Sequence, residues 1–357
     1  MVLHADWLPP AHYPCFGMNK INLEDWYGKH GRKDLPWRNT RDPYAIYISE
    51  IMLQQTQVKT VLERFYHPFL KRFPTLDSLK KTSITEVLKA WEGLGYYSRA
   101  RNLHRAAVAA APAMPDTVDG LMALPGIGRN TAHAIASFAF NLPVPVMEAN
   151  VKRILHRVLA KEKLNDAQLF EAAATLLGAN DPFIHNQAMM DIGATLCTPK
   201  SPQCLICPLN IACKGKTDPE RYPAPKRKKA VPVREKIILA ARDAAGKLYL
   251  KAGSKNLLGG LYAFAQFDPA SSISWQKKKY PLKGLPKIGS VTHTYSHFRL
   301  EGNVHLLQLT EKKTGPHWHT PDEIHRLPLS KADHKTLALL ERHGEKDASR
   351  PRRKQRA

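Results

Sequence analysis

Four cysteines near the middle of the chain are the residues best suited to chemistry. They are Cys197, Cys204, Cys207 and Cys213, and their spacing is C-x6-C-x2-C-x5-C. Four thiolates in so short a stretch can surround one metal centre, either a tetrahedral zinc ion or a 4Fe-4S cluster. Zinc sites usually pair two short C-x2-C segments across a longer insert, and here only one such segment exists. The spacing therefore favours the cluster, with zinc as the alternative.

The carboxyl group of Glu50 is a second candidate for chemistry. It shares a predicted helix face with Ile46 and Leu53, four residues before it and three after it. A carboxyl group on an apolar face is desolvated, which raises its pKa and lets it act as a general acid near neutral pH. A buried glutamate paired with Arg or Lys explains the pattern as simply, and the residues alone favour that structural role.

The charge of the chain indicates its partner. Lys and Arg number 54 against 31 Asp and Glu, for a formal net charge of +23. The basic residues gather in three runs: 226–229, 277–279 and 350–356. This balance predicts a nucleic acid as partner. We see no apolar run that could span a bilayer and no signal peptide, so we expect a cytoplasmic, nucleoid-associated protein that is not secreted.

The elements that must position these residues form two groups. The first part of the chain has helical periodicity almost throughout. Helices are predicted at 21–30, 44–57, 58–72, 84–93, 100–111, 129–141, 151–159, 167–177 and 185–196. A basic, proline-rich linker follows, and then the pattern changes to strands. Strands are predicted at 237–241, 248–251, 261–267, 288–294 and 304–309, and helices at 322–327 and 331–342.

Residues 124–129 read LPGIGR and connect a helix around Leu121 to another that begins near Arg129. Gly126 and Gly128 allow the turn to approach another backbone closely, and the following helix offers unpaired N–H groups to a phosphate. These are the properties of a helix-hairpin-helix DNA clamp. A plain helix–helix turn explains the glycines equally well by themselves, but the basic charge and the four cysteines favour the clamp.

Together these parts resemble the helix-hairpin-helix DNA glycosylases of the endonuclease III superfamily. Three segments resemble signatures of the MutY-type adenine DNA glycosylases within it: 49–58 (SEIMLQQTQV), 93–103 (GLGYYSRARNL) and 186–191 (NQAMMD). The resemblance runs from about residue 23 to residue 342. It implies a base excision repair enzyme that hydrolyses the N-glycosidic bond of adenine mispaired with 8-oxoguanine or G in duplex DNA. It also supports the 4Fe-4S cluster as cofactor.

The resemblance assigns the catalytic residues. It makes Glu50 the acid that protonates the departing purine, and Glu148 the second carboxylate beside the sugar. Asn150 matches an asparagine of the family, and we expect it to cap its helix. The chain departs from the family here, because Glu148-Ala149 replaces the usual Asp-Gly. The charge is kept but reaches one methylene further. A purely structural Glu148 would instead complement the helix dipole.

Other matches concern contact with DNA. Asn130 stands where the bifunctional lyases of the superfamily have lysine, so we expect a monofunctional glycosylase. Gln55 and Tyr96 match positions that wedge into the duplex beside the lesion. A polar residue at a helix end and a core tyrosine are the respective alternatives. Gly126, Gly128 and Arg129 complete the predicted DNA-binding set.

The second domain resembles the MutT-like, Nudix-type α/β module of the family. Residues 258–264 (LGGLYAF) and 292–298 (THTYSHF) carry this resemblance. Tyr295, Ser296 and His297 are the implied readers of 8-oxoguanine, although Tyr295 replaces the usual Phe and Leu258 the usual Trp. The acidic magnesium-binding Nudix helix is absent after Phe267, so this module is expected to bind and not to hydrolyse.

The predicted architecture is a multidomain chain. An all-α glycosylase domain (21–213) contains the helix-hairpin-helix (121–135) and the iron–sulfur loop (197–213). A basic linker (214–236) and a smaller α/β Nudix-like domain (237–343) follow it. Residues 1–20 and 344–357 are expected to be disordered. We expect a monomer that binds duplex DNA containing A:8-oxoguanine or A:G mispairs. The alternatives are a weakly active or non-catalytic iron–sulfur DNA-binding protein and an endonuclease III-like lyase.

Overall fold

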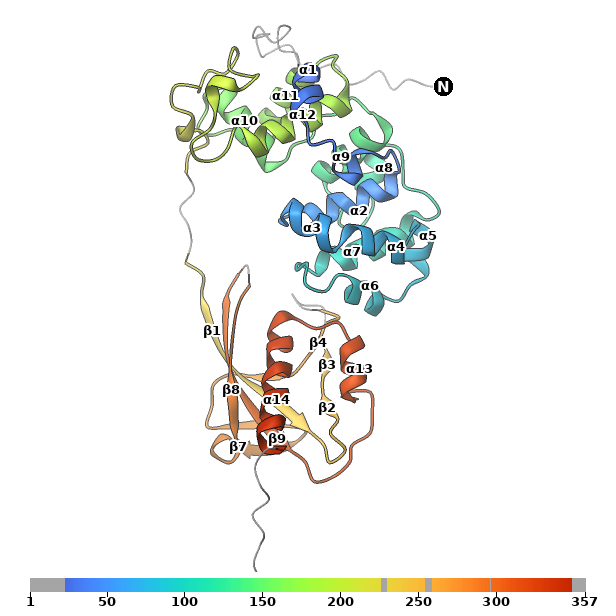
Figure 1. Ribbon diagram of the computed structural model, residues 1–357, viewed down its shortest axis with the longest axis vertical. Helices are drawn as coiled ribbons and strands as arrows, with labels where there is room; N and C mark the ends of the chain where they lie inside the picture. The colour runs from blue at the N-terminus through green and yellow to red at the C-terminus, as the bar shows by residue number, and fades with distance from the viewer. Residues whose placement is uncertain (1–22, 226–229, 254–258, 296, 349–357) are drawn as a thin grey trace, which may run out of the picture. The chain divides into compact units, whose positions relative to one another are not determined.

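The computed structural model describes residues 23–225, 230–253, 259–295 and 297–348. Contacts divide the chain into two compact units (Figure 1). Unit 1 comprises residues 1–81 and 102–227, and unit 2 comprises residues 82–101 and 228–357. Helix α7 (Ser98–Ala110) therefore crosses the boundary between them. Residues 1–20, the basic run 226–229 and residues 349–357 of the predicted disordered tail lie outside the described residues. The expectation of disorder is wrong for residues 344–348, which continue the last helix of the chain.

Unit 1 is built from helices. They are α1 (Leu23–His30), α2 (Pro43–Leu53), α3 (Val58–Arg64), α4 (Tyr66–Arg72), α5 (Leu76–Lys81), α8 (Val118–Met122), α9 (Arg129–Phe140), α10 (Ala149–Val158), α11 (Asp166–Leu177) and α12 (Pro182–Thr195). Two of them start with the same local signal. Asp42 caps α2 and Asp181 caps α12, each followed by a proline whose missing N–H is no loss at a helix start.

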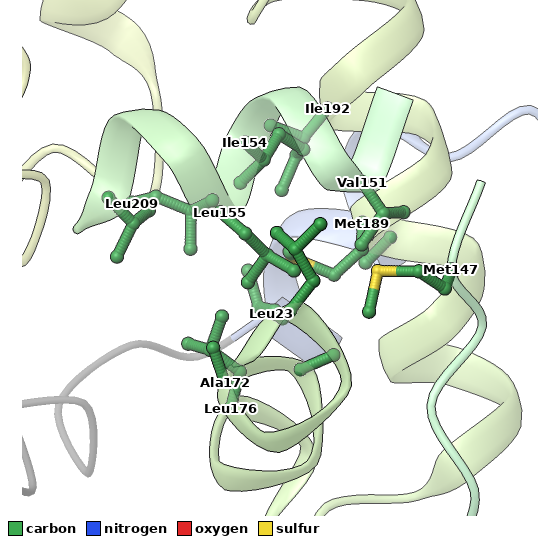
Figure 2. Close-up of a cluster of buried hydrophobic side chains, with 14 of the residues drawn as sticks. Leu23, Met147, Val151, Ile154, Leu155, Ala172, Leu176, Met189, Ile192 and Leu209 are labelled. Atoms are coloured by element: carbon green, nitrogen blue, oxygen red, sulfur yellow. The ribbon is translucent and has the colours of Figure 1, made fainter. Parts of the chain in front are cut away.

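One hydrophobic core of unit 1 lies between α1, α10, α11 and α12. Figure 2 shows Val151, Ile154 and Leu155 of α10 pointing toward Met189 of α12 and Leu23 of α1. The apolar residues of α10 recur at helical spacing, so one face of this helix is buried. The partly buried Cys197, Cys207 and Cys213 pack against the same core. The cysteine loop is therefore attached directly to the helix that follows Glu148.

Two predicted helices of unit 1 are shorter or divided. The helix predicted at 58–72 breaks at Phe65, which leaves helical geometry with φ −123° and separates α3 from α4. The helix predicted at 44–57 ends at Leu53, because Gln54 leaves helical geometry with a ψ of 111° and Gln55 adopts a left-handed φ of 57°. Periodicity continues across both breaks and therefore does not reveal them.

Unit 2 is organised around a six-stranded sheet of order β10-β2-β1-β9-β8, with β5 also pairing with β1. The strands are β1 (Val233–Arg242), β2 (Leu248–Tyr249), β5 (Ala265–Phe267), β8 (Lys287–Thr294), β9 (Arg299–Gln308) and β10 (Trp318–His319). Only β1 and β9 run parallel. Short hairpins pair β3 (Lys251–Ala252) with β4 (Tyr262–Ala263) and β6 (Ser272–Trp275) with β7 (Lys278–Pro281).

Both faces of strand β1 are buried. Ile238 and Ala240 join a core with residues of α13 (Pro321–Arg326) and α14 (Lys331–Ala348). Ile237 and Leu239 point the other way, into a core that contains Trp275 and Trp318. The predicted central strands are present, whereas β6, β7 and β10 were not expected from the sequence. Between β5 and β8 the described chain forms the β6–β7 hairpin and a short 3-10 turn, Leu282–Gly284.

The close packing of α10 on α12 gives a test of the fold. A Cβ added at Gly193 would lie 2.6 Å from the Cβ of Asn150 and 3.3 Å from its Cα. We expect Gly193→Ala to lower the free energy of unfolding by about 1–3 kcal/mol, because backbone must move. Gly28→Ala is the control, since no atom lies within 4 Å of its added Cβ. Equal stability of the two variants in urea titrations would contradict the packing.

Candidate active site and nucleic-acid interface

Glu50 lies on α2, and its side chain is buried among the apolar residues of that helix. Burial raises its pKa to about 8, the negative charge of Glu148 adds to the rise, and Arg38 opposes it. The pairing with Arg or Lys that would make Glu50 purely structural is not present among the described residues, because no ion pair or hydrogen bond is formed by its carboxyl group. A buried carboxyl group with this pKa holds its proton at neutral pH.

Glu148 occupies the N-cap position of α10, with extended geometry, but its side chain makes no capping hydrogen bond. The residue is exposed to solvent, yet desolvation by its surroundings still raises its pKa. The expectation that Asn150 caps this helix is wrong, because α10 begins one residue before it. The Asn150 side chain instead accepts a hydrogen bond from Arg153 at 2.9 Å. Asn150 lies in the first turn of α10, and Glu148 is the residue at the cap position.

The loop before Glu148 is held by Asn186 of α12. Its side-chain oxygen accepts from the backbone N–H of Val146 at 2.9 Å. Its amide nitrogen donates to the carbonyl of Val144 and the hydroxyl of Ser137, both at 2.9 Å. All of these groups are buried or partly buried, so the loop has little freedom. The NQAMMD segment therefore fixes the loop that leads to Glu148.

Asp191 of α12 is the centre of a buried ionic cluster in the same unit. Arg38 donates to both of its carboxylate oxygens, at 2.6 and 2.8 Å. Arg32 donates from its backbone N–H at 2.9 Å and from Nε at 2.6 Å. Burial opposes ionisation of Asp191, but these hydrogen bonds and charges outweigh it and lower its pKa. The cluster fixes Arg38, whose charge acts on Glu50.

Four buried side-chain atoms of the described part of unit 1 have no protein partner: Arg38 Nε, Tyr47 Oη, His185 Nδ1 and Gln187 Oε1. Tyr47 precedes Glu50 by three residues on α2, and Gln187 precedes Asp191 by four on α12, so each shares a helix face with a site residue. A buried polar atom without a partner costs free energy unless a ligand or water satisfies it. The oxygens of Tyr47 and Gln187 can therefore accept a hydrogen bond from a ligand or from water.

The predicted DNA clamp is formed by α8, the turn and α9. Gly126 has φ 80°, and an added Cβ would lie 2.5 Å from the Cβ of Asn102, so only glycine fits this position. Gly128 is the N-cap of α9 and has open space around it. The Arg129 guanidinium lies over the ring of Phe170, 3.7 Å from its centroid, while remaining exposed. The free N–H groups at this helix start suit a phosphate.

Gln55 and Tyr96, the predicted wedge residues, share an unusual backbone conformation. Their φ angles are 57° and 48°, in the left-handed region that residues other than glycine rarely adopt. Both are exposed, and 38% of Tyr96 is accessible. The alternative role of Tyr96 as a core residue is therefore wrong. Strained, exposed residues of this kind gather at functional sites, where the surrounding structure maintains them.

Within unit 2, the loop that contains Tyr96 and the end of β8 line a cavity of about 240 Å³. Its walls include Tyr96, Tyr97, His293, Tyr295, His297, Ser330 and Lys331. Tyr97 donates to the carbonyl of Leu329 at 3.4 Å, and Arg101 donates to that of Gly259 at 2.6 Å. The structure thus brings together three residues predicted from sequence: Tyr96, Tyr295 and His297. Ser296 and Leu258 lie outside the described residues.

Tyr295 is anchored on three sides in this cavity. Its ring meets that of His293 edge-on at 4.4 Å and lies 4.8 Å from that of Phe298. Burial raises its pKa, and a hydrogen bond with Ser330 partly opposes the rise. The pKa of His293 is lowered by burial and then by the charges of Lys335 and Lys331. The hydroxyl that distinguishes Tyr295 from Phe therefore ties this turn to the segment that starts α14.

The four cysteines line one pocket together with apolar side chains of α10 and the loop. Arg157 donates to the sulfur of Cys197 at 3.2 Å and to the carbonyl of Thr198 at 2.8 Å. Burial and the neighbouring thiols raise the pKa of Cys207 to about 11, so a metal would have to displace its proton. Across the described residues, no three His, Cys, Asp or Glu side chains are arranged to hold a single metal ion.

Comparison with known proteins identifies the family of the chain. Residues 48–178 match the model of the HhH-GPD superfamily base excision DNA repair proteins, and residues 238–339 match the NUDIX domain. An adenine DNA glycosylase of Buchnera aphidicola subsp. Schizaphis graminum is 35% identical over 337 residues, covering 88% of this chain and 96% of its own. The chain belongs to the adenine DNA glycosylase family. The human adenine DNA glycosylase is 32% identical over 402 residues, covering 90% of this chain and 73% of its own.

Solved structures support the helical architecture. A thermostable thymine-DNA glycosylase has a TM-score of 0.51 and 29% identity, covering 55% of this chain and 93% of its own. An endonuclease III trapped on DNA has the same TM-score with 20% identity, covering 58% of this chain and 100% of its own, and so shares the fold. The prediction of a helical glycosylase domain followed by a Nudix-like α/β domain is confirmed. Among the residues described, no helix has the length and apolar character to cross a bilayer.

Several residues of these sites were not found from sequence. Arg38 and Asp191 are far apart in the chain, and only Asp191 lies in a recognised motif. His293 and Lys331 reach the unit 2 cavity from segments without a distinctive spacing. Arg157 contacts the cysteine loop from α10, where it reads as an ordinary helix-end cation. A cation next to a motif is too common in this basic chain to serve as a signal.

The raised pKa of Glu50 gives a test that does not depend on activity. Between about pH 4.5 and pH 8 the native state keeps a proton that the unfolded state has lost, so stability falls as pH rises through this window. We expect Glu50→Gln to remove this slope and to raise the free energy of unfolding at pH 7 by up to about 3 kcal/mol. Urea titrations from pH 4 to pH 9 measure it. If the free energy of unfolding depends on pH in the same way for the wild type and the variant, Glu50 is not desolvated. Glu63→Gln, which removes an exposed carboxyl group, is the control.

Proposed function

We propose that the protein removes adenine mispaired with 8-oxoguanine or G from duplex DNA, as a monofunctional glycosylase. The observation that carries this proposal is the pair formed by Glu50 and Glu148. One carboxyl group is buried and protonated at neutral pH, and the other lies close enough for its charge to act on the first. Acid–base cleavage of a glycosidic bond uses two carboxyl groups, one that protonates the leaving group and one beside the sugar.

The buried Glu50 acts as the general acid. Adenine departs easily only when a ring nitrogen is protonated, and a carboxylic acid of pKa about 8 still holds its proton at pH 7. The unpartnered oxygens of Tyr47 and Gln187 offer the base hydrogen-bonding groups. Once Glu50 has given up its proton, Arg38 stabilises the resulting carboxylate. The Asp191 cluster maintains the position of that arginine.

Glu148 faces the sugar. Its carboxylate stabilises the positive charge that develops as the glycosidic bond breaks, or adds to the sugar covalently until water releases it. Its freedom from a capping hydrogen bond supports this role, because a side chain that capped α10 would be turned away. Asn130, in place of an amine, provides no nucleophile for Schiff-base chemistry, so the product is an abasic site with an intact strand.

The unit 2 cavity is the proposed reader of the lesion. Tyr295 and His297, with Ser296 between them, offer hydrogen bonds to 8-oxoguanine, while Gln55 and Tyr96 enter the duplex and stabilise the flipped state. Gly126, Gly128 and Arg129 bind the backbone. We further propose that the protein works as a monomer on nucleoid DNA in the cytoplasm, without contact with a membrane.

The four cysteines are proposed to hold a 4Fe-4S cluster. Four thiols that share one apolar pocket fit such a group, and the N–H donors around them support it. Arg157 donates to Cys197, and the backbone N–H groups of Leu209 and Gly215 donate to Cys207 and Cys213. The cluster, when bound, supplies a rigid anchor for the loop that packs on α10.

The catalytic proposal predicts a separation of chemistry from binding. With a duplex containing one A:8-oxoguanine pair, Glu50→Gln should reduce single-turnover adenine release by at least about 100-fold and leave the Kd within a few-fold. Glu148→Gln should behave in the same way, because an amide cannot stabilise a cationic sugar. Wild-type protein that binds but does not release adenine would establish a non-catalytic binding protein, and strand cleavage would establish a lyase.

The cofactor proposal predicts a yellow-brown protein with broad absorption at roughly 400 nm and about four iron atoms per chain. Cys204→Ser should reduce iron content and lower the melting temperature, because the loop loses an attachment. Thr198→Ser is the matched control, because it changes the same loop and leaves all four thiols in place. A colourless wild-type protein containing one zinc ion would instead establish the tetrahedral alternative.

A further inference from the structure

The β6–β7 hairpin has two chemically different sides. Ile273 and Trp275 are buried, and the Trp275 ring meets those of Tyr249 and Trp318 edge-on at 5.2 and 6.2 Å. The other side and the tip carry Lys277, Lys278 and Lys279, all of them exposed. The core thus fixes the hairpin on the sheet and leaves three consecutive ammonium groups in solvent.

The charge of this region is not neutralised by its surroundings. Residues 269–300 contain five lysines and Arg299 and no Asp or Glu. None of the ion pairs in the described chain involves the three tip lysines; the nearby carboxylate of Glu311 is paired with Lys313 and also feels the charge of Lys278. The exposed large apolar side chains of the described chain lie elsewhere. A charged tip without an apolar anchor suits a polyanion better than a protein partner.

The turn at the tip is strained. Trp275 pairs with Lys278, so Gln276 and Lys277 form a two-residue loop, with φ angles of 47° and 63°. Such loops favour Asn-Gly, because left-handed geometry costs other residues about 1 kcal/mol or more each. A sequence selected only for the turn would have glycine at the second position. The lysine retains a charge at the tip at a cost in stability.

The tip is far from the lesion-reading end of the sheet. Val233 pairs with Arg299 beside the β8–β9 turn, and Arg242 pairs with Gln308 at the other end. Ten residues of strand span about 30 Å. Trp275 of the hairpin packs on Tyr249 and Trp318, and Leu248, next to Tyr249, pairs with Arg242, so the hairpin lies at the Arg242 end. Figure 1 likewise shows β7 opposite to the start of β1. At about 3.4 Å per base pair this separation equals about nine base pairs.

We propose that Lys277, Lys278 and Lys279 form a second contact to duplex DNA phosphates, separate from the lesion-reading cavity. The phosphates belong either to DNA flanking the mispair or to a second duplex. This inference rests on the proposed function only in one respect, the position of the mispair at the β8–β9 turn. The contact itself is independent of sequence and of catalysis, and it holds the enzyme on undamaged DNA.

The test measures Kd against salt concentration on a mispair-free duplex of about 40 base pairs, so it does not depend on the glycosylase reaction. Each phosphate contact contributes about 0.9 to the slope of log K against log salt. The quadruple variant Q276N/K277G/K278Q/K279Q, which removes all three charges, should reduce the slope by about 2–3. Its changes at positions 276 and 277 relieve the strained turn, so the melting temperature should rise while binding weakens. K278R with K279R keeps the charge and should keep the slope.

Duplexes carrying 8-oxoguanine opposite a non-hydrolysable adenosine analogue then identify the source of the phosphates. A slope reduced on about 40 base pairs, but not on about 12, places the contact on flanking DNA. If the phosphates belong to a second duplex, competitor DNA should accelerate dissociation of the wild type from the short duplex. It should not accelerate dissociation of the variant. An unchanged slope on mispair-free DNA, with a raised melting temperature, overturns the proposal and leaves the proposed function untouched.

Discussion

The buried carboxylate of Asp191 is the interaction on which the candidate active site depends. It has no exposure to solvent, and it is kept ionised by two arginines from the segment between α1 and α2. Removing one partner from such a cluster leaves a buried charge uncompensated, which costs several kcal/mol. The cluster therefore joins two segments that are far apart in the sequence, and it holds Arg38 where its charge counteracts the burial of Glu50.

The balance at Glu50 follows from three opposing influences. Burial and the charge of Glu148 keep its proton on, while Arg38 favours the ionised form that remains after proton transfer. An acid with such a pKa holds a proton at neutral pH and can still donate it. Glu148, the N-cap residue of α10, therefore influences the acid in addition to its proposed role beside the sugar.

The sequence predicted the helical and strand-bearing halves, because periodicity and composition change clearly between them. It also predicted that the four cysteines share one site and singled out Tyr96, Tyr295 and His297, since these rest on distinctive motifs, but it did not predict that the three aromatic residues line one cavity. It missed the break at Phe65 and the strands β6, β7 and β10, which are short and are stabilised by tertiary contacts rather than by local pattern. Arg38 and Asp191 could not be paired in advance, because nothing in one segment marks its partner in the other.

The division of the chain has a topological consequence. Residues 82–101 belong by their contacts to unit 2, although unit 1 precedes and follows them in sequence. Glu92 accepts from the backbone of Leu329 at 2.8 Å and pairs with His334, which anchors this insertion to the far end of the chain. A single cut in the polypeptide therefore cannot yield both units intact. Limited proteolysis near residue 228 would release a C-terminal fragment that lacks part of its own unit, and shuffling of the Nudix-like domain between genes would carry the same penalty.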